Sequence, residues 1–159
     1  MNIKLKVKSG ITANAYSSFE EAVASSKKEL ENYDEIRGNR VTNIEYASSA
    51  IAISFENTDF VAVISINDNR IDCNITKEIP DSLSATGATI PDQVKLDFSG
   101  VIVDWNRELF FAQFVGKIIA LSPSDQYLFL FVKGGADYMC QYLIDENKIY
   151  APFLYLSEY

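Results

Sequence analysis

The sequence lacks histidine altogether and contains only two cysteines. Each shortage excludes particular kinds of catalytic, metal or disulfide site. Without histidine the chain cannot form the Ser-His or Cys-His pair that ordinarily activates a nucleophile. Cys73 and Cys140 are too few for a disulfide framework or a four-ligand zinc site. We expect two reduced thiols in apolar strands, because unpaired cysteine is commonly buried, while a single disulfide between them stays open.

Nucleotide, hydrolase and metal motifs are missing as well. The sequence contains no Walker loop, dinucleotide fingerprint, GxSxG elbow, zinc spacing or EF-hand loop. KGGAD at residues 133–137 lacks the flanking pattern of a phosphate-binding loop and is typical of a hairpin turn. Any catalysis would depend on carboxylates, Lys, Tyr or Cys. The sequence therefore identifies no enzyme, no catalytic residue and no cofactor.

Basic residues are scarce. The 159 residues include 14 Lys and Arg against 22 Asp and Glu, a net charge of −8. Residues 1–40 have seven basic and six acidic side chains, net +1, which leaves seven basic and sixteen acidic ones, net −9, for residues 41–159. Such an acidic surface repels nucleic acid and anionic lipid, because both bind mainly through basic side chains. We expect a neutral or basic protein partner, and neither nucleic acid nor membrane.

No apolar run is long enough to cross a membrane. The most apolar stretch, LFFAQFVGKIIALS at residues 109–122, falls short of the about 20 residues that a membrane helix needs. The start, MNIKLKVKSG, alternates apolar and charged residues and so lacks the apolar core of a secretion signal. We therefore expect a cytoplasmic protein.

The hydrophobic pattern predicts one α+β domain over residues 1–159, with two main helices on a mostly antiparallel sheet. Residues 3–8 (IKLKVK) alternate apolar residues with lysine, as in a half-buried edge strand. The spacing then becomes helical, and Ser17 or Ser18 can cap a helix through a capping box. The apolar stripe of this predicted helix consists of Phe19, Val23, Leu30 and Tyr33.

The rest of the chain is predicted to be mostly strand. Four β-branched segments are joined by links too short for a parallel crossover, which indicates an antiparallel meander. These segments are VTNIEYA, SAIAISF, FVAVISI and RIDCNIT, at residues 41–47, 49–55, 60–66 and 70–76. A long loop at residues 77–93 and a strand within residues 94–103 follow. Three C-terminal strands are expected at residues 126–133, 137–145 and 148–156.

The apolar stretch at residues 109–122 is interpreted as part of the second helix, which starts near Trp105 and is capped by Asp104 or Asn106. On such a helix one narrow seam would be less apolar than the rest, and it would contain Asn106, Gln113, Lys117 and Ala120. We expect burial of Trp105, Leu109, Ala112, Val115 and Ile119. Phe110 and Phe114 flank the seam and are candidate interface residues, with packing under the long loop as the alternative.

Acidic turns supply the other candidate partner-binding residues. Glu56 and Asp59 share one predicted turn, Asp68 and Asp72 lie at the next, and Asp81 lies in the long loop. Asp68 and Asp72 could instead act in acid-base catalysis, or bind a cation together with Asp59. Ordinary solvated turn residues are the simpler interpretation, and no metal site is assigned. The two turns should lie at opposite ends of the meander, and we favour the end with Asp68 and Asp72.

Three functions fit these features. In its small size, acidity and lack of catalytic motifs the chain resembles the bacterial immunity proteins as a class, which implies neutralisation of a cognate toxin, such as a nuclease with a basic cleft. The second hypothesis is a small-molecule-binding or enzymatic domain with a pocket between the second helix and the C-terminal strands. The third is an assembly subunit in which an identical chain covers the apolar helix, giving a homodimer.

Overall fold

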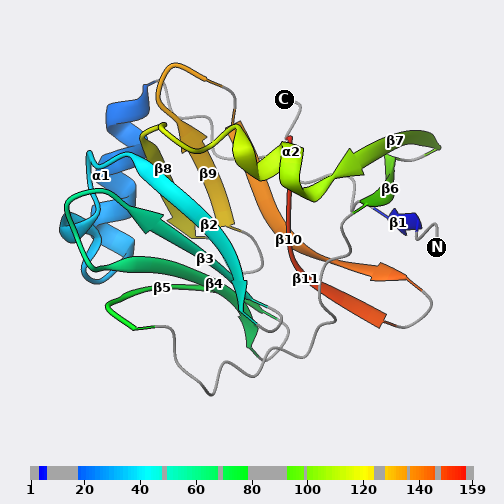
Figure 1. The fold of residues 1–159 in the computed structure, drawn as a ribbon, viewed down its shortest axis with the longest axis horizontal. Helices are drawn as coiled ribbons and strands as arrows, with labels where there is room; N and C mark the ends of the chain where they lie inside the picture. Colours follow the sequence, from blue (N-terminus) through cyan, green and yellow to red (C-terminus); the bar gives the residue numbers. More distant parts are fainter. Residues whose placement is uncertain are drawn as a thin grey trace.

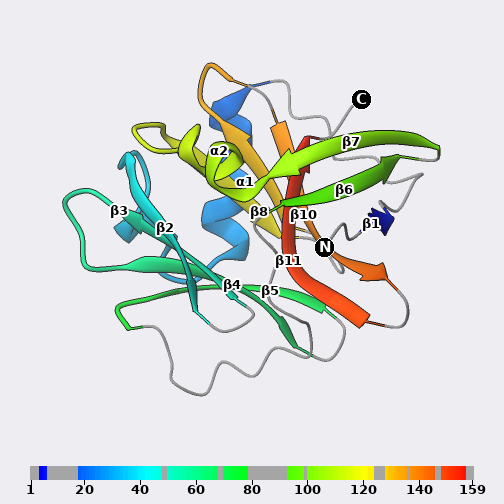
Figure 2. The same cartoon turned by 45° about the vertical axis from the view of Figure 1, so that its right-hand side comes forward.

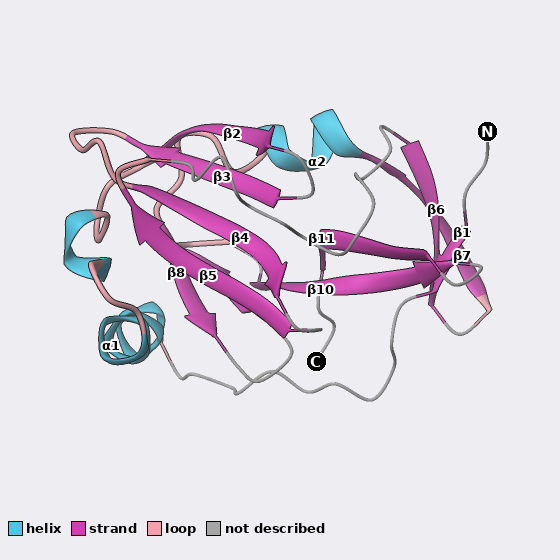
Figure 3. Cartoon of the chain, turned by 90° about the horizontal axis from the view of Figure 1, so that it is seen from below, coloured by secondary structure: helices cyan, strands magenta, loops and turns pink. Residues whose placement is uncertain are grey.

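A computed structural model describes residues 4–6, 18–47, 50–67, 70–78, 93–98, 100–123, 128–135, 137–145 and 148–156. Within these ranges the protein contains two α-helices, one of them short, a 3₁₀ turn at Tyr33–Glu35 and mostly antiparallel strands. The predicted α+β fold class is therefore confirmed. Figures 1 and 3 show the longer helix, α1 (Phe19–Glu29), at one end of the molecule, and the hairpin of β6 (Gln93–Phe98) and β7 (Val101–Asn106) at the opposite end.

Helix α1 (Phe19–Glu29) begins where the capping box predicts. Ser18 is the N-cap, and its Oγ accepts a hydrogen bond from the backbone N–H of Glu21 at 3.2 Å. Ala22 and Ser26 form the buried face of the helix, and the Ser26 hydroxyl donates to the Ala22 carbonyl at 2.8 Å. This face packs against the larger of two sheets, so the prediction of a helix lying on a sheet is confirmed.

The predicted meander forms the smaller sheet. Its strands, in spatial order, are β2 (Val41–Ala47), β3 (Ala50–Phe55), β4 (Val61–Asn67) and β5 (Arg70–Thr76). All neighbouring pairs are antiparallel, as the short links require. Asn57 adopts a φ of 62° in the β3–β4 turn, a conformation that Asn tolerates better than most residues. The β4–β5 turn at residues 68–69 lies outside the described residues.

The larger sheet has the order β7-β6-β1-β10-β9-β8, and β11 also pairs with β10. Its strands are β1 (Lys4–Lys6), β6 (Gln93–Phe98), β7 (Val101–Asn106), β8 (Ile119–Pro123), β9 (Leu128–Val132), β10 (Asp137–Asp145) and β11 (Lys148–Leu156). The three predicted C-terminal strands are confirmed as β9, β10 and β11. Strand β10 pairs along its first residues with β9 and near its end with β1, so it joins two parts of this sheet.

The two sheets meet where β2 begins. The Val41 N–H donates to the Lys117 carbonyl at 2.8 Å, and the Gly116 N–H donates to the Val41 carbonyl at 2.7 Å. Strand β3 is buried along nearly its whole length, so it lies inside the protein rather than on its surface. The largest fully buried side chains come from both sheets and from the turn before β8: Ile51, Ile53, Ile64, Leu96, Phe114, Leu121, Leu128 and Leu130.

The second helix is much shorter than predicted. Helix α2 (Arg107–Ala112) is followed by a turn and then by strand β8, so residues 109–122 are not one helix. Gly116 in the turn has a φ of 85°, a left-handed conformation in which other L-residues are strained. Strand β8 then pairs along its length with β9, and this ladder overrides the helical spacing of the sequence. None of the described helices is long and apolar enough to cross a membrane.

The predicted burial around the second helix is correct only in part. Trp105 and Ile119 are buried, but they belong to strands, while Leu109 is 75% exposed. Ala112 and Val115 are exposed too, which contradicts the prediction. Phe110 is half-buried, and Phe114 is 1% exposed and belongs to the core, not to an exposed seam. Ala120, which was assigned to that seam, is fully buried in β8.

Candidate functional site

Three of the five exposed large apolar side chains of the described residues lie on the β6–β7 hairpin. Val101, Ile102 and Val103 are 64%, 43% and 44% exposed on three consecutive residues of β7. Consecutive strand residues point to opposite faces, so both faces of β7 carry uncovered aliphatic side chains. Figure 2 shows the hairpin extending outward from the rest of the larger sheet. Surfaces of this kind frequently mark interaction sites.

The pairing of β7 with β6 explains why one of these faces is apolar. Val103 lies opposite Leu96, and Trp105 lies opposite Val94. Residues directly opposite one another share a face, so Val103 continues a face on which Leu96, Val94 and Trp105 are all buried. The apolar face therefore extends beyond the part of the core that covers it.

Polar contacts hold the hairpin in shape. Gly100 has a φ of 102° in the two-residue connection, and its N–H donates to Asp97 Oδ1 at 2.7 Å. Lys95 Nζ donates to Asp104 Oδ1 at 2.8 Å across the two strands. Sequence reasoning treated residues 94–103 as a single strand and missed this hairpin. The signal was the sequence DFSGVIV, in which a Ser-Gly pair separates two apolar runs.

Helix α2 begins immediately after β7. Asn106 is its N-cap, and its side-chain oxygen accepts a hydrogen bond from the Leu109 N–H at 3.0 Å. The prediction that Asp104 or Asn106 caps the second helix is therefore confirmed for Asn106. Leu109 and Val115 also expose their side chains, on and beyond this helix. We call these five exposed residues, Val101, Ile102, Val103, Leu109 and Val115, the apolar strip.

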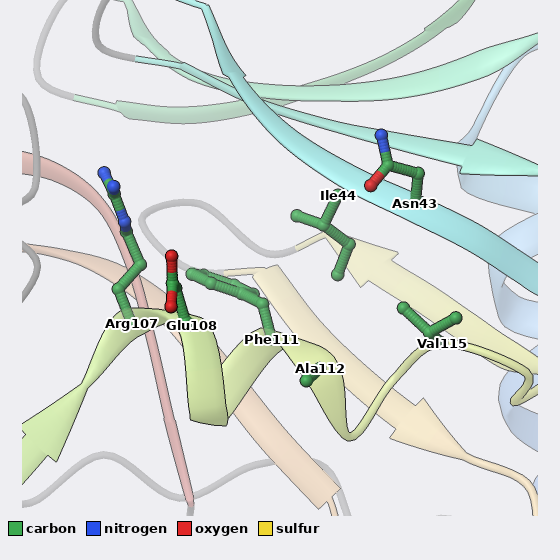
Figure 4. A pocket seen from close by; sticks show the side chains of 7 residues that line it. All are labelled: Asn43, Ile44, Arg107, Glu108, Phe111, Ala112 and Val115. Carbon is green, nitrogen blue, oxygen red and sulfur yellow. The ribbon is translucent and has the colours of Figure 1, made fainter.

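Two open pockets flank α2. One, of about 370 Å³, separates α2 from β2 and is lined by Asn43, Ile44, Arg107, Glu108, Phe111, Ala112 and Val115. In Figure 4, Arg107, Glu108 and Phe111 rise from α2 on the side that faces β2. The other, of about 460 Å³, lies against the hairpin and is lined by Gln93, Val94, Lys95, Asp104, Trp105, Asn106 and Leu109. Both pockets border the apolar strip.

The space between α2 and the C-terminal strand β10 is filled by aromatic rings. Phe110 and Phe114 lie edge-on to Tyr138, with ring centroids 5.4 Å and 4.9 Å apart. The Tyr138 hydroxyl donates to Gln113 Oε1 at 2.9 Å, and burial raises the pKa of Tyr138. Phe110 and Phe114 thus pack directly against β10, and the two pockets described above lie on other sides of α2.

The acidic candidate residues do not form one cluster. Glu56 and Asp59 lie at the β3–β4 turn, where the Glu56 N–H donates to the Arg40 carbonyl at 2.9 Å. Asp72 lies in β5 opposite Ser65, toward the other end of the meander. Asp68 and Asp81 lie outside the described residues. Within the described part of the chain, no three acidic or cysteine side chains are grouped to hold a metal ion.

Neither cysteine forms a disulfide in this structure. Cys140 is fully buried in β10, and Cys73 is half-buried in β5. Burial, with a smaller contribution from the Asp72 carboxylate, raises the pKa of Cys73 to about 12. A thiol with so high a pKa carries almost no nucleophilic thiolate near neutral pH. Both cysteines lie in strands, as the sequence predicts.

Comparison with known proteins gives no relative from which a function could be transferred. No protein-family model matches the chain, and no curated protein or solved structure is significantly similar to it. The functional proposal therefore depends on the shape, exposure and charge of the surface around β7 and α2.

Proposed function

We propose that this chain is an acidic binding protein that recognises a basic protein partner through the apolar strip. The proposal is supported by one observation above all: a chain with a net charge of −8 exposes consecutive aliphatic residues on β7 and further ones around α2. Burial of apolar surface favours protein association, and surrounding charge accelerates encounter with an oppositely charged partner.

Within this class we propose an immunity protein that neutralises a basic toxin domain, such as a nuclease. A nuclease cleft must attract phosphate, so an inhibitor that occupies it benefits from negative charge. The small size of the chain and its lack of nucleotide, hydrolase and metal motifs support this role.

A second candidate function is small-molecule binding beside α2. The pocket of about 370 Å³ contains both a cation and an anion, Arg107 and Glu108, next to the ring of Phe111. Its volume is near the lower end of the range for ligand sites. It is open rather than enclosed, so we place it second to protein binding.

The gene directly upstream of this one supplies the test. Its product is expressed alone and together with this chain, and cell growth is compared. Growth arrest by the upstream product that co-expression relieves, together with a stable complex of the two purified proteins, is the expected result. An upstream product that is harmless and belongs to metabolism, with no complex formed, would contradict the immunity role and favour the pocket.

A further inference from the structure

Strand β7 lies at the edge of the larger sheet formed by the described strands. Strand β7 is the last in the strand order, and none of the described strands pairs with its outer side. An edge strand presents a row of N–H and C=O groups that an added strand can pair. We propose that an extended, basic segment of a protein partner adds to β7 as a further strand of this sheet. This inference rests on the partner-binding function proposed above and specifies its geometry.

The hairpin geometry identifies the backbone groups that would bind the added strand. Phe98 and Val101 flank a two-residue connection, and such a pair is joined by hydrogen bonds. Hydrogen-bonded and non-hydrogen-bonded pairs alternate along antiparallel strands. The next pair, Asp97 with Ile102, is therefore of the second kind, and Ile102 turns its N–H and C=O away from β6. Asp104 does the same two residues later.

The side chains of β7 fit an incoming strand of alternating character. On one face, Val101 and Val103 continue the apolar face of Leu96, so apolar residues of the added strand would be covered there. On the opposite face, Ile102 is accompanied by Asp97 and Asp104, and by Lys95, which forms an ion pair with Asp104. Basic residues of the added strand would lie beside the Asp104 carboxylate, which is exposed at the edge of the sheet, in a chain whose net charge is −8.

Strand β7 lacks most of the features that keep edge strands unpaired. Natural edge strands are usually protected by charged side chains, above all lysine, by proline, by a bulge or by very short length. The one charged residue of β7 is Asp104, which would repel an acidic strand but not a basic one. The sequence of β7, VIVDWN, contains neither lysine nor proline, and its register with β6 is unbroken from Val101 to Asn106. A second copy of this chain could pair with the same backbone groups. It would, however, bring another net charge of −8 and a second Asp104, and this repulsion favours the basic partner.

The test uses a short synthetic peptide of alternating lysine and valine with blocked ends, and a matched peptide with glutamate in place of lysine. Trp105 is the only tryptophan of the chain and belongs to β7, so its fluorescence reports binding. We expect the basic peptide to bind more tightly than the acidic one and to lose affinity as salt rises. Amide hydrogen exchange, followed by NMR, should slow at Ile102 and Asp104 when the basic peptide binds.

Two substitutions at the same position separate the backbone from the side chain. Ile102→Pro removes the outward N–H without removing a hydrogen bond of the hairpin. We expect it to weaken peptide binding about tenfold or more, because a carbonyl of the added strand loses its donor. Ile102→Thr keeps the N–H and a β-branched shape and should retain most of the affinity. Thermal unfolding verifies that each variant is folded, and if Ile102→Pro is not, amide exchange in the unchanged chain decides.

Several results would overturn the inference. The inference is wrong if the basic and acidic peptides bind with equal affinity, or if the two Ile102 variants do. It is also wrong if the basic peptide leaves amide exchange at Ile102 and Asp104 unchanged. Slow exchange at these amides without peptide, together with dimers in analytical ultracentrifugation, would assign the edge to a second copy. A toxin that binds and is neutralised while these amides exchange freely would refute strand addition and leave the immunity role intact. Peptide binding at the edge, together with a harmless upstream product, would support strand addition and contradict the immunity role.

Discussion

The ring of Phe114 lies edge-on to the ring of Tyr138, with centroids 4.9 Å apart and an angle of 78° between the ring planes. This contact joins the turn after α2 to β10, although the two residues are far apart in the sequence. Phe110 and Phe111 contact Phe114 as well, with centroids 5.4 Å and 6.5 Å away. The aromatic cluster thus anchors α2 on the larger sheet and leaves Leu109 facing outward.

The first prediction compares two residues of the same apolar stretch. Phe114→Ala should lower the free energy of unfolding by about 3 to 5 kcal/mol, because a large buried ring is lost and a cavity remains. Leu109→Ala should change it by less than about 0.5 kcal/mol, because its side chain is already in solvent. Urea unfolding measures both. Equal destabilisation would mean that residues 109–114 form the buried helix expected from the sequence.

The second prediction concerns the start of α2. Asn106→Ala should lower the free energy of unfolding by about 0.5 to 2 kcal/mol, because the Leu109 N–H loses its acceptor. Asn106→Ser should retain most of the stability, since serine is also a good N-cap. Thermal unfolding of both variants provides the comparison. If the two variants were equally unstable, the effect would come from lost packing and not from the cap.

The third prediction is a loss of stability at alkaline pH. Burial, more than the nearby Asp72 carboxylate, raises the pKa of Cys73 from 9.0 to about 12. Between these values the unfolded thiol is ionised while the folded thiol keeps its proton. The unfolded state then binds fewer protons, so the free energy of unfolding falls as pH rises through this window. Tyr33 acts in the same direction, because burial raises its pKa from 10.0 to about 12.

Urea midpoints between pH 8 and pH 11, and the same series for Cys73→Ala, measure this effect. We expect the midpoint of the unchanged chain to fall above pH 9 and the fall to be smaller in the variant. Below pH 9 the thiol is protonated in both states and contributes no slope. Identical pH profiles for the two proteins would show that the Cys73 thiol has an ordinary pKa in the folded chain.

Local sequence patterns predicted the elements that depend on local interactions. The cap at Ser18 and the strands of the meander were correct, because one side chain and a two-residue period determine them. The end of α2 at Ala112 was not predicted, because the apolar spacing of residues 113–119 fits a longer helix as well as a turn and a strand. Only pairing with β9 makes Ile119 and its neighbours a strand. The exposed edge of β7 depends on the order of strands in the sheet, which no local pattern encodes.

The last prediction identifies which acidic residues accelerate partner binding. Asp104 lies on β7 within the proposed interface, whereas Asp59 lies at the β3–β4 turn of the other sheet. Once the partner is purified, Asp104→Asn should slow association at low salt and have little effect at high salt, where charges are screened within about 8 Å or less. Asp59→Asn removes the same charge from the chain and is the matched control.

The pair Asp68→Asn with Asp72→Asn tests the surface that the sequence favoured, and its association rate should stay close to that of the unchanged chain. Lys95 donates to Asp104, so Lys95→Met is included to separate a lost ion pair within the hairpin from a lost contact with the partner. If Lys95→Met and Asp104→Asn slow association equally, the ion pair matters through the shape of the hairpin. Slowing by Asp104→Asn alone assigns that carboxylate to the encounter, whereas slowing by the Asp68 and Asp72 pair alone would move the recognition surface to the far end of the meander.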